Sequence, residues 1–346
     1  MNNTSNINKP YIRDVMKERI LVLDGAMGSL IQEYKLEEED FRGERFKNHS
    51  HPLKGNNDLI GLVRPDILKD IHKVYLEAGA DIIETNTFSG TSIAQADYAL
   101  EDAVYDINYF SAKIAVDIAN EFTAKDPSKP RYVAGTIGPT NRTLSLSPDV
   151  NDPAYRAITW DEVVKSYKEQ IKALLDGGVD ILLVETIFDT LNAKACLYAI
   201  DEVFEEKGIK LPIMVSGTIT DASGRTLSGQ TAEAFLISVS HMDLISIGLN
   251  CALGAKMMKP YLDVLSKNTD FGISCHPNAG LPNEMGEYDE SPRDMTNQIQ
   301  EYHEENLVNI IGGCCGTTPE HIKAMAKLAA KYKPREMGKV NCCVSC

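Results

Sequence analysis

The sequence predicts an α/β protein built as a single (β/α)8 barrel, or TIM barrel, with long loops at the C-terminal face. Eight short apolar runs recur along the 346 residues, and segments with helical periodicity lie between them. Eight strands that alternate with helices over this length are typical of the barrel. A doubly wound open sheet is the alternative, but the stretch LDGAMGS after the first run lacks G-x-G-x-x-G spacing.

The expected strands stay apolar almost throughout, which is typical of a parallel sheet that is covered on both faces. Many of their residues are β-branched, as strands prefer. In chain order, the expected strands are residues 20–25, 81–86, 131–136, 180–186, 213–218, 244–251, 271–277 and 308–315.

Helical periodicity and helix boundary signals predict the intervening helices. Thr159 is an N-cap candidate before WDEVV, and Thr318 precedes a proline at the first helical position. The joints AGAD (78–81) and GGVD (177–180) predict helices that end at glycine. The expected helices are residues 65–78, 160–175, 190–204, 231–239, 260–266 and 319–332.

Three segments fall outside the repeat. Polar residues 32–63 and 138–159 each follow the C-terminal end of a strand. Loops this long are often functional, so we expect both to overhang the barrel mouth. Residues 1–335 are expected to form the barrel domain, and residues 336–346 a flexible tail that contains cysteines.

Composition limits the function. The formal net charge of −15 argues against nucleic acid or an anionic membrane as partner, since such binding draws on Lys and Arg clusters. The polar N-terminus lacks the apolar core of a secretory signal, which predicts a cytoplasmic protein in a reducing compartment. The eight cysteines are therefore interpreted as metal ligands, catalytic thiols or buried residues rather than a disulfide framework.

Polar residues at the C-terminal ends of barrel strands form the site in this fold. The strand ends here carry carboxylates, amides, a histidine and thiols. They are Asp24, Glu84, Asn86, Glu185, Asn250, Cys251, His276, Asn278, Cys314 and Cys315. The sequence thus predicts that three thiols and three carboxylates share one rim.

The stretch IIGGCCGTTP places Cys314 and Cys315 between glycines directly after an apolar run. Glycine permits the sharp bend that two neighbouring thiols need to serve one site. With Cys251 they make three sulfur ligands, and three protein ligands with an open fourth position are typical of catalytic Zn²⁺. The alternatives are core packing for Cys251 and a strained vicinal disulfide for the pair, while Cys196 is interpreted as core.

Asp24 and Glu185 are predicted to hold a substrate ammonium, although either could instead be a helix N-cap. A carboxylate that ends an apolar strand is costly without a cationic partner. The turn at Gly25, Ala26 and Met27 offers N–H groups for a carboxylate. The site would therefore hold an amino acid, with His276 structural and Glu84, Asn86 and Asn250 supporting the rim.

With these residues in view, the chain from Arg19 to Pro334 resembles the homocysteine-binding modules of cobalamin-dependent methionine synthases, within the homocysteine S-methyltransferase family. GLNCALG and GGCCGTTPEHI are similar to the zinc motifs of the family, and LDGAMGS to its substrate turn. The resemblance implies a zinc ion held by Cys251, Cys314 and Cys315. It also implies L-homocysteine bound through sulfur to zinc, its ammonium near Asp24 and Glu185, with Asn278 as fourth ligand until substrate displaces it.

The stretches LKGNNDLIGLVRPD, ETNTFSGTSIAQADY, SGTITDASGRTLSGQT and HPNAGLPNEMGEYDESP resemble the cobalamin-dependent branch. The chain has no D-x-H-x-x-G stretch for cobalt and no folate or cobalamin module after this one. We therefore expect methylcobalamin, methylated from 5-methyltetrahydrofolate, to be carried on another chain, a corrinoid- and folate-binding subunit.

Two alternatives remain at this point. One is a corrinoid-independent methyltransferase that uses S-methylmethionine, S-adenosylmethionine or betaine. The other is a structural zinc protein without turnover, whose closed site would recruit His276 or a cysteine of the tail. The tail cysteines Cys342, Cys343 and Cys346 are interpreted as an appendage or a second thiol site.

Overall fold

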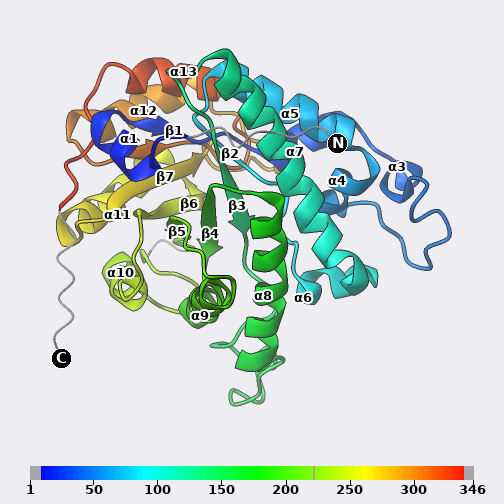
Figure 1. Cartoon of the computed structure of the whole chain (residues 1–346). Coiled ribbons are helices and arrows are strands. Elements are labelled where there is room, and N and C mark those ends of the chain that lie inside the picture. Colours follow the sequence, from blue (N-terminus) through cyan, green and yellow to red (C-terminus); the bar gives the residue numbers. More distant parts are fainter. Residues whose placement is uncertain (1–8, 221–222, 339–346) are drawn as a thin grey trace.

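Eight parallel strands form one barrel in the computed structural model, which describes residues 9–220 and 223–338 (Figure 1). The sheet order is β1-β8-β7-β6-β5-β4-β3-β2, and a parallel bridge between Leu23 and Ile82 joins its two ends. The predicted barrel is confirmed, and the open sheet is wrong. The strands are β1 (Leu21–Val22), β2 (Ile82–Glu84), β3 (Tyr132–Ile137), β4 (Ile181–Ile187), β5 (Ile213–Gly217), β6 (Ser246–Gly254), β7 (Gly272–Asn278) and β8 (Ile310–Ile311).

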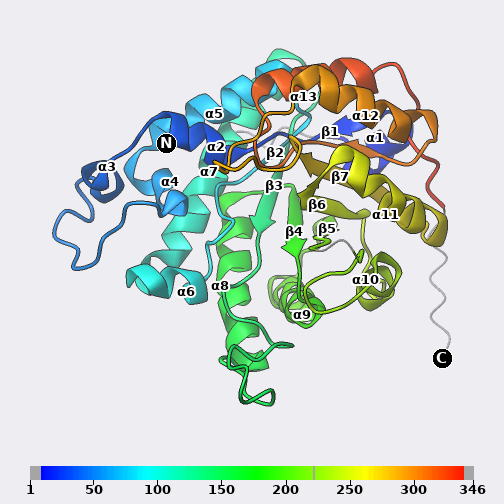
Figure 2. The same cartoon turned by 180° about the vertical axis from the view of Figure 1, so that it is seen from behind.

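The helices surround the strands, as the two opposite views show (Figures 1 and 2). All six predicted helices are present, although the bounds of five of them differ by one to five residues from those expected. They are α5 (Pro65–Ala78), α8 (Trp160–Gly177), α9 (Thr190–Lys207), α10 (Ala232–Val239), α11 (Ala255–Asn268) and α13 (Pro319–Ala329). The sequence interpretation missed α1 (Ile12–Glu18), α2 (Met27–Glu33), α3 (Glu38–Arg42), α4 (Ile60–Val63), α6 (Ser92–Gln95), α7 (Val104–Lys125) and α12 (Pro292–Glu304).

The predicted helix boundaries have the expected physical causes. The Thr159 side chain accepts from the Glu162 N–H while Glu162 accepts from the Thr159 N–H, which makes a capping box for α8. Pro65 begins α5. Gly79 and Gly178 end α5 and α8 at φ +113° and +89°, where a side chain would be strained.

The core has two layers. Inside the barrel, Leu21, Leu23, Ile82 and other inward strand residues pack together, and Ile12 and Met16 of α1 join them. The second, larger layer lies between the strands and the surrounding helices. Because α1 contributes to the inner layer, it closes one end of the barrel and leaves the C-terminal ends of the strands for a site.

The segment predicted as a long polar loop at residues 32–63 is partly helical, since it contains α3, the 3-10 helix η1 (Asn57–Leu59) and α4. That part of the prediction is wrong, because short helices here alternate with turns and leave no long apolar period. Residues 138–159 hold neither helix nor strand, as expected.

Arg335 donates to the carbonyl oxygens of Ser266, Thr269 and Phe271, and Met337 packs against the inner core. The chain therefore stays attached to the barrel close to the expected domain boundary at 335. Cys342, Cys343 and Cys346 lie outside the described residues. Within the described ranges, no helix is both long and apolar enough for a membrane span.

Candidate metal and substrate site

The three predicted cysteines meet at the C-terminal face of the barrel. The Sγ atoms of Cys251, Cys314 and Cys315 all lie within 4.8 Å of one another. The Cys251 and Cys315 sulfurs are 3.8 Å apart. Sulfurs bound tetrahedrally to zinc at about 2.3 Å would be separated by roughly 3.8 Å. The thiol cluster therefore has the dimensions of a tetrahedral zinc site.

Unusual backbone geometry brings these thiols together. Cys251 and Ala252 have φ of 60° and 59°, and the register of β6 against β7 shifts between Asn250 and Gly254. Non-glycine residues in the left-handed region carry strain that functional sites commonly store. The bulge re-aims the Cys251 side chain relative to an ordinary strand.

The cysteine pair lies in a turn after β8, which ends at Ile311. The Cys314 N–H donates to the Pro277 carbonyl, and the Cys315 carbonyl accepts from the Ala279 N–H. A Cβ on Gly313 would lie 2.3 Å from Thr317 Oγ1, so a side chain there would displace the turn. The strand has ended and the backbone bends, as the sequence predicted.

Crowding of the thiols perturbs their protonation. Hydrogen bonds from Cys251 and Cys314 lower the pKa of the Cys315 thiol to about 3. The pKa of Cys314 is raised, first by its hydrogen bond with Cys251 and then by that with Cys315. One sulfur thus concentrates negative charge beside two protonated neighbours, an arrangement that a bound cation would stabilise.

A cavity of about 370 Å³ opens beside the thiol cluster. Of the predicted site residues, Gly25, Ala26, Met27, Glu84, Asn86, Glu185, Cys251, His276, Cys314 and Cys315 line it. Asp24, Asn250 and Asn278 are not among its lining residues. A larger groove of about 740 Å³ lies between α7, α8 and α9 and carries lysines and acids but no thiol, so the chemistry points to the smaller cavity.

Three carboxylates cluster at the cavity: Glu84 and Glu185 line it, and Asp24 is hydrogen-bonded to the backbone of Glu84 without lining it. Asp24 is buried, and its Oδ2 accepts from the Glu84 N–H at 3.1 Å while its Oδ1 has no partner in the structure. Burial raises the pKa of Asp24 and of Glu84, and it raises the pKa of Glu185 to about 8. Among the described residues, neither Lys nor Arg lines the cavity. A cationic ligand would relieve this unfavourable burial of acids.

Asn250 fixes the positions of neighbouring residues at the C-terminal ends of the strands. Its Nδ2 donates to Glu185 Oε2 at 3.0 Å and to Thr186 Oγ1 at 2.8 Å. Its Oδ1 accepts from the Thr186 N–H and from Ser216 Oγ. Both N–H donors of this amide have an acceptor, and its oxygen accepts two hydrogen bonds, so no polar atom is left without a partner. It therefore fixes Glu185 next to Thr186, which has φ of 55° at a register shift of β4.

Of the remaining predicted residues, Asn86 has a hydrogen-bond partner, whereas His276 and Asn278 have buried polar atoms without one. Asn86 Nδ2 donates to the Asn57 carbonyl at 2.6 Å. His276 is buried with neither ring nitrogen bonded, and its pKa is lowered to about 3 by burial. Asn278 Oδ1 is also buried without a partner. Cys196 is fully buried on α9.

Sequence reasoning missed several lining residues. Asp58, Phe88, Ser89 and Thr186 also line the cavity. Asp58 Oδ1 accepts from the Ser89 N–H at 2.9 Å. Asp58 lies in a polar segment away from any strand end, and the only signal for it was the expectation that residues 32–63 overhang the mouth.

A family model described as homocysteine S-methyltransferase matches residues 21–329. The chain belongs to the homocysteine S-methyltransferase family. Family membership supports methylation of homocysteine as its reaction and makes the protein a methyltransferase. The thiol cluster and the cavity are thus features of a homocysteine S-methyltransferase family member.

Solved structures confirm the fold for this family member. The metallated form of the homocysteine methyltransferase MmuM from Escherichia coli is 20% identical with a TM-score of 0.68, covering 90% of this chain and 97% of that one. Its oxidized form is 21% identical with a TM-score of 0.69, covering 92% and 99%. At this identity the likeness concerns the barrel alone.

Proposed function

We propose that this protein transfers a methyl group to the sulfur of L-homocysteine and so makes methionine. The observation that supports it most is one cavity bordered both by a three-thiol cluster of zinc dimensions and by carboxylates without a cation. A substrate with a thiol at one end and an ammonium at the other complements both features.

We assign Cys251, Cys314 and Cys315 as ligands of Zn²⁺, which when bound would keep the homocysteine sulfur as thiolate at neutral pH. Asn278 is assigned as the fourth ligand before substrate binds. Its buried Oδ1 lacks a partner, and its two neighbours, Pro277 and Ala279, are hydrogen-bonded to the cysteine pair. Buried polar atoms are rarely left unpaired without a function.

Asp24 and Glu185 are assigned to the substrate ammonium. The unpartnered Oδ1 of Asp24 and the raised pKa of Glu185 support this, because an ammonium would pair with both carboxylates. The Ala26 N–H already donates to Thr317 Oγ1 at 3.2 Å. The substrate carboxylate is therefore assigned to the turn at Gly25, Ala26 and Met27 through the other two N–H groups.

In the reaction, the homocysteine sulfur forms a bond to the methyl carbon while the bond from that carbon to its donor breaks. The electron pair of the broken bond leaves with the donor, so no general base is required. We assign methylcobalamin, methylated from 5-methyltetrahydrofolate and carried by a corrinoid- and folate-binding partner chain, as the donor. The motifs that resemble the cobalamin-dependent branch support this assignment.

A corrinoid-independent donor is the second candidate. The chain matches 97% to 99% of the length of a solved homocysteine methyltransferase, so a barrel of this size spans nearly all of that protein. This favours a reaction that needs no further module, with S-methylmethionine, S-adenosylmethionine or betaine as donor.

Turnover distinguishes these proposals. Zinc-loaded protein is incubated with L-homocysteine and each donor in turn, and methionine is measured by mass spectrometry. Methionine from methylcobalamin alone supports the first donor, and methionine from a sulfonium or betaine supports the second. Absence of methionine with every donor, together with homocysteine failing to bind, would favour a structural zinc protein instead.

A further inference from the structure

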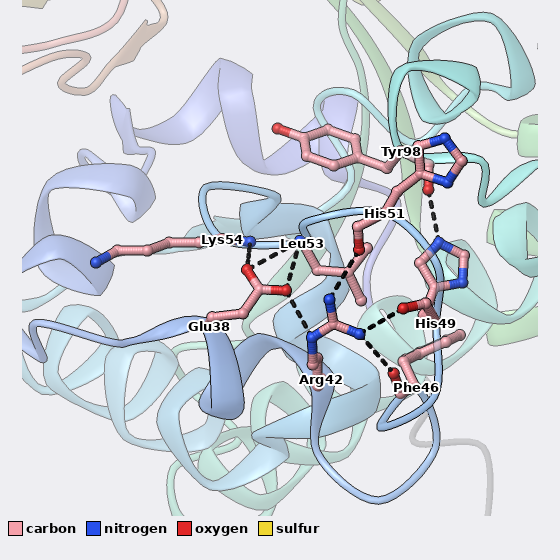
Figure 3. A network of polar contacts seen from close by, with 8 residues as sticks. All are labelled: Glu38, Arg42, Phe46, His49, His51, Leu53, Lys54 and Tyr98. Carbon is pink, nitrogen blue, oxygen red and sulfur yellow. Dashed lines mark hydrogen bonds and ion pairs between the residues drawn. The ribbon is translucent and has the colours of Figure 1, made fainter.

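A segment without helix or strand, residues 43–56, leads from α3 to the cavity and is folded around one arginine. The Arg42 guanidinium donates through Nη1 to the carbonyls of Phe46 and His49, at 3.4 and 2.7 Å. Nη2 donates to the His51 carbonyl at 3.1 Å. Figure 3 shows the backbone loop curving around this side chain.

Glu38 completes the arrangement from one helical turn earlier. Its carboxylate pairs with Arg42 Nε at 2.7 Å and accepts from the N–H groups of Leu53 and Lys54 (Figure 3). Both side chains are partly buried, at 22% exposure for Arg42 and 29% for Glu38. Hydrogen bonds in which one partner is charged are roughly twice as strong as those between neutral groups. We call Glu38, Arg42 and residues 46–54 the Arg42 clasp.

The clasp ends where the cavity wall begins. Residues 55–58 follow directly after Lys54, and Gly55, Asn57 and Asp58 among them line the cavity. We call residues 55–58 the wall. The wall is bonded to the loop after β2 at two points: the Asn57 carbonyl accepts from Asn86, and Asp58 accepts from the Ser89 N–H.

Two further contacts fix the same region. The Asn56 and Gln95 side-chain amides, both buried, bond each other, and His49 Nε2 bonds the Tyr98 carbonyl at 2.8 Å. The wall is thus held at one end by the clasp and at the other by the loop after β2.

We propose that Arg42 is a positioning residue that sets the place of the Gly55–Asp58 wall and thereby the affinity of the cavity for its amino-acid substrate. This inference rests on the proposed function only for the identity of that substrate. Lysine cannot replace Arg42, because a single ammonium does not reproduce the fork that reaches Glu38 and three carbonyls.

The test compares Arg42→Lys with Arg45→Lys in zinc-loaded protein. Arg45 lies in the same segment but pairs with Asp106 at the surface, so it is the matched control. For Arg42→Lys we expect the KM for homocysteine to rise about tenfold with kcat within about twofold, because wall contacts bind ground and transition states alike. Arg45→Lys should match the wild type.

Hydrogen exchange gives a second readout that needs no turnover. Arg42→Lys should speed amide exchange at Leu53, Lys54 and Ser89 while zinc content stays unchanged. Wild-type protection or a wild-type KM in this variant would overturn the proposal. If the variant does not fold, Glu38→Gln, which removes the ion pair and retains an acceptor, takes its place. If the wild type neither binds nor methylates homocysteine, the proposed function fails. Amide exchange at Ser89 alone then tests whether Arg42 positions the wall.

Discussion

Removal of any one cluster cysteine should abolish stoichiometric zinc binding. A site with three sulfur ligands and one open position keeps only two sulfurs when one cysteine is removed, and two are too few to hold Zn²⁺. We expect Cys251→Ala, Cys314→Ala and Cys315→Ala to lose zinc and methyl transfer while circular dichroism still shows a folded barrel. Cys196→Ala, a change in the core on α9, is the matched control and should retain the metal. A cluster variant that keeps one zinc per chain would refute the ligand assignment.

Titration of Asp58 should make the free energy of unfolding depend on pH. Burial raises its pKa from 3.8 to about 6, opposed by the Ser89 N–H. Between these values the unfolded chain has lost the proton while the folded chain keeps it, so stability falls as the pH rises from about 4 to about 6. A shift of this size corresponds to roughly 3 kcal/mol at most.

Asp58→Asn keeps an acceptor for Ser89 and removes the titration. The variant should therefore gain roughly 1 to 3 kcal/mol over wild type at pH 7 and almost nothing at pH 4. Urea unfolding of both proteins at the two pH values measures this difference. An equal difference at both pH values would show that burial of the Asp58 charge has no energetic effect.

At the scale of single residues, the sequence indicated those candidate site residues whose neighbours form a recognisable pattern. Glycines around Cys314 and Cys315, and a carboxylate that ends an apolar strand at Glu185, were visible without a structure. Asp58 and Ser89 could not be found this way, because they enter the cavity only through contacts between separate loops.

At the scale of elements, strands were easier to predict than helices. Each strand is a compact apolar run, whereas α7 buries polar Asn108 and Ser111 along with its aliphatic residues. The Asn108 Nδ2 donates to the carbonyls of Gly90 and of Val104, which satisfies its burial without an apolar side chain. This mixture weakens the helical period, and the longest helix was missed for that reason.

The turn after β8 depends on Gly316. Its φ is +77°, and an added Cβ would lie 2.2 Å from Tyr288 Cβ. Gly208, which ends α9 at φ +64°, has nothing within 4 Å of the same position. Both Gly→Ala variants should lose roughly 1 to 2 kcal/mol for the left-handed backbone. Gly316→Ala should lose about 1 to 3 kcal/mol more through overpacking.

Only Gly316→Ala should also weaken zinc binding, because only it displaces the turn that carries Cys314 and Cys315. Urea unfolding and competition with a chelator measure the two effects. Equal losses of stability in the two variants, with equal zinc affinity, would mean that Tyr288 places no constraint on the turn.

At the scale of the whole molecule, eight apolar runs that alternate with helical segments sufficed to predict the closed barrel. The helix α1, whose residues Ile12 and Met16 join the inner core, was not predicted, because seven residues show too little periodicity. The Arg42 clasp was equally hidden, since side-chain bonds to backbone carbonyls leave no pattern in sequence.

The proposed function depends on an open zinc site that accepts the homocysteine sulfur. The most direct test is zinc content with X-ray absorption at the zinc edge, on protein purified under reducing conditions, with and without L-homocysteine. An open site should show one zinc with three sulfurs and one lighter ligand, changing to four sulfurs when homocysteine is added. Four sulfurs before addition, or no zinc at all, would contradict it.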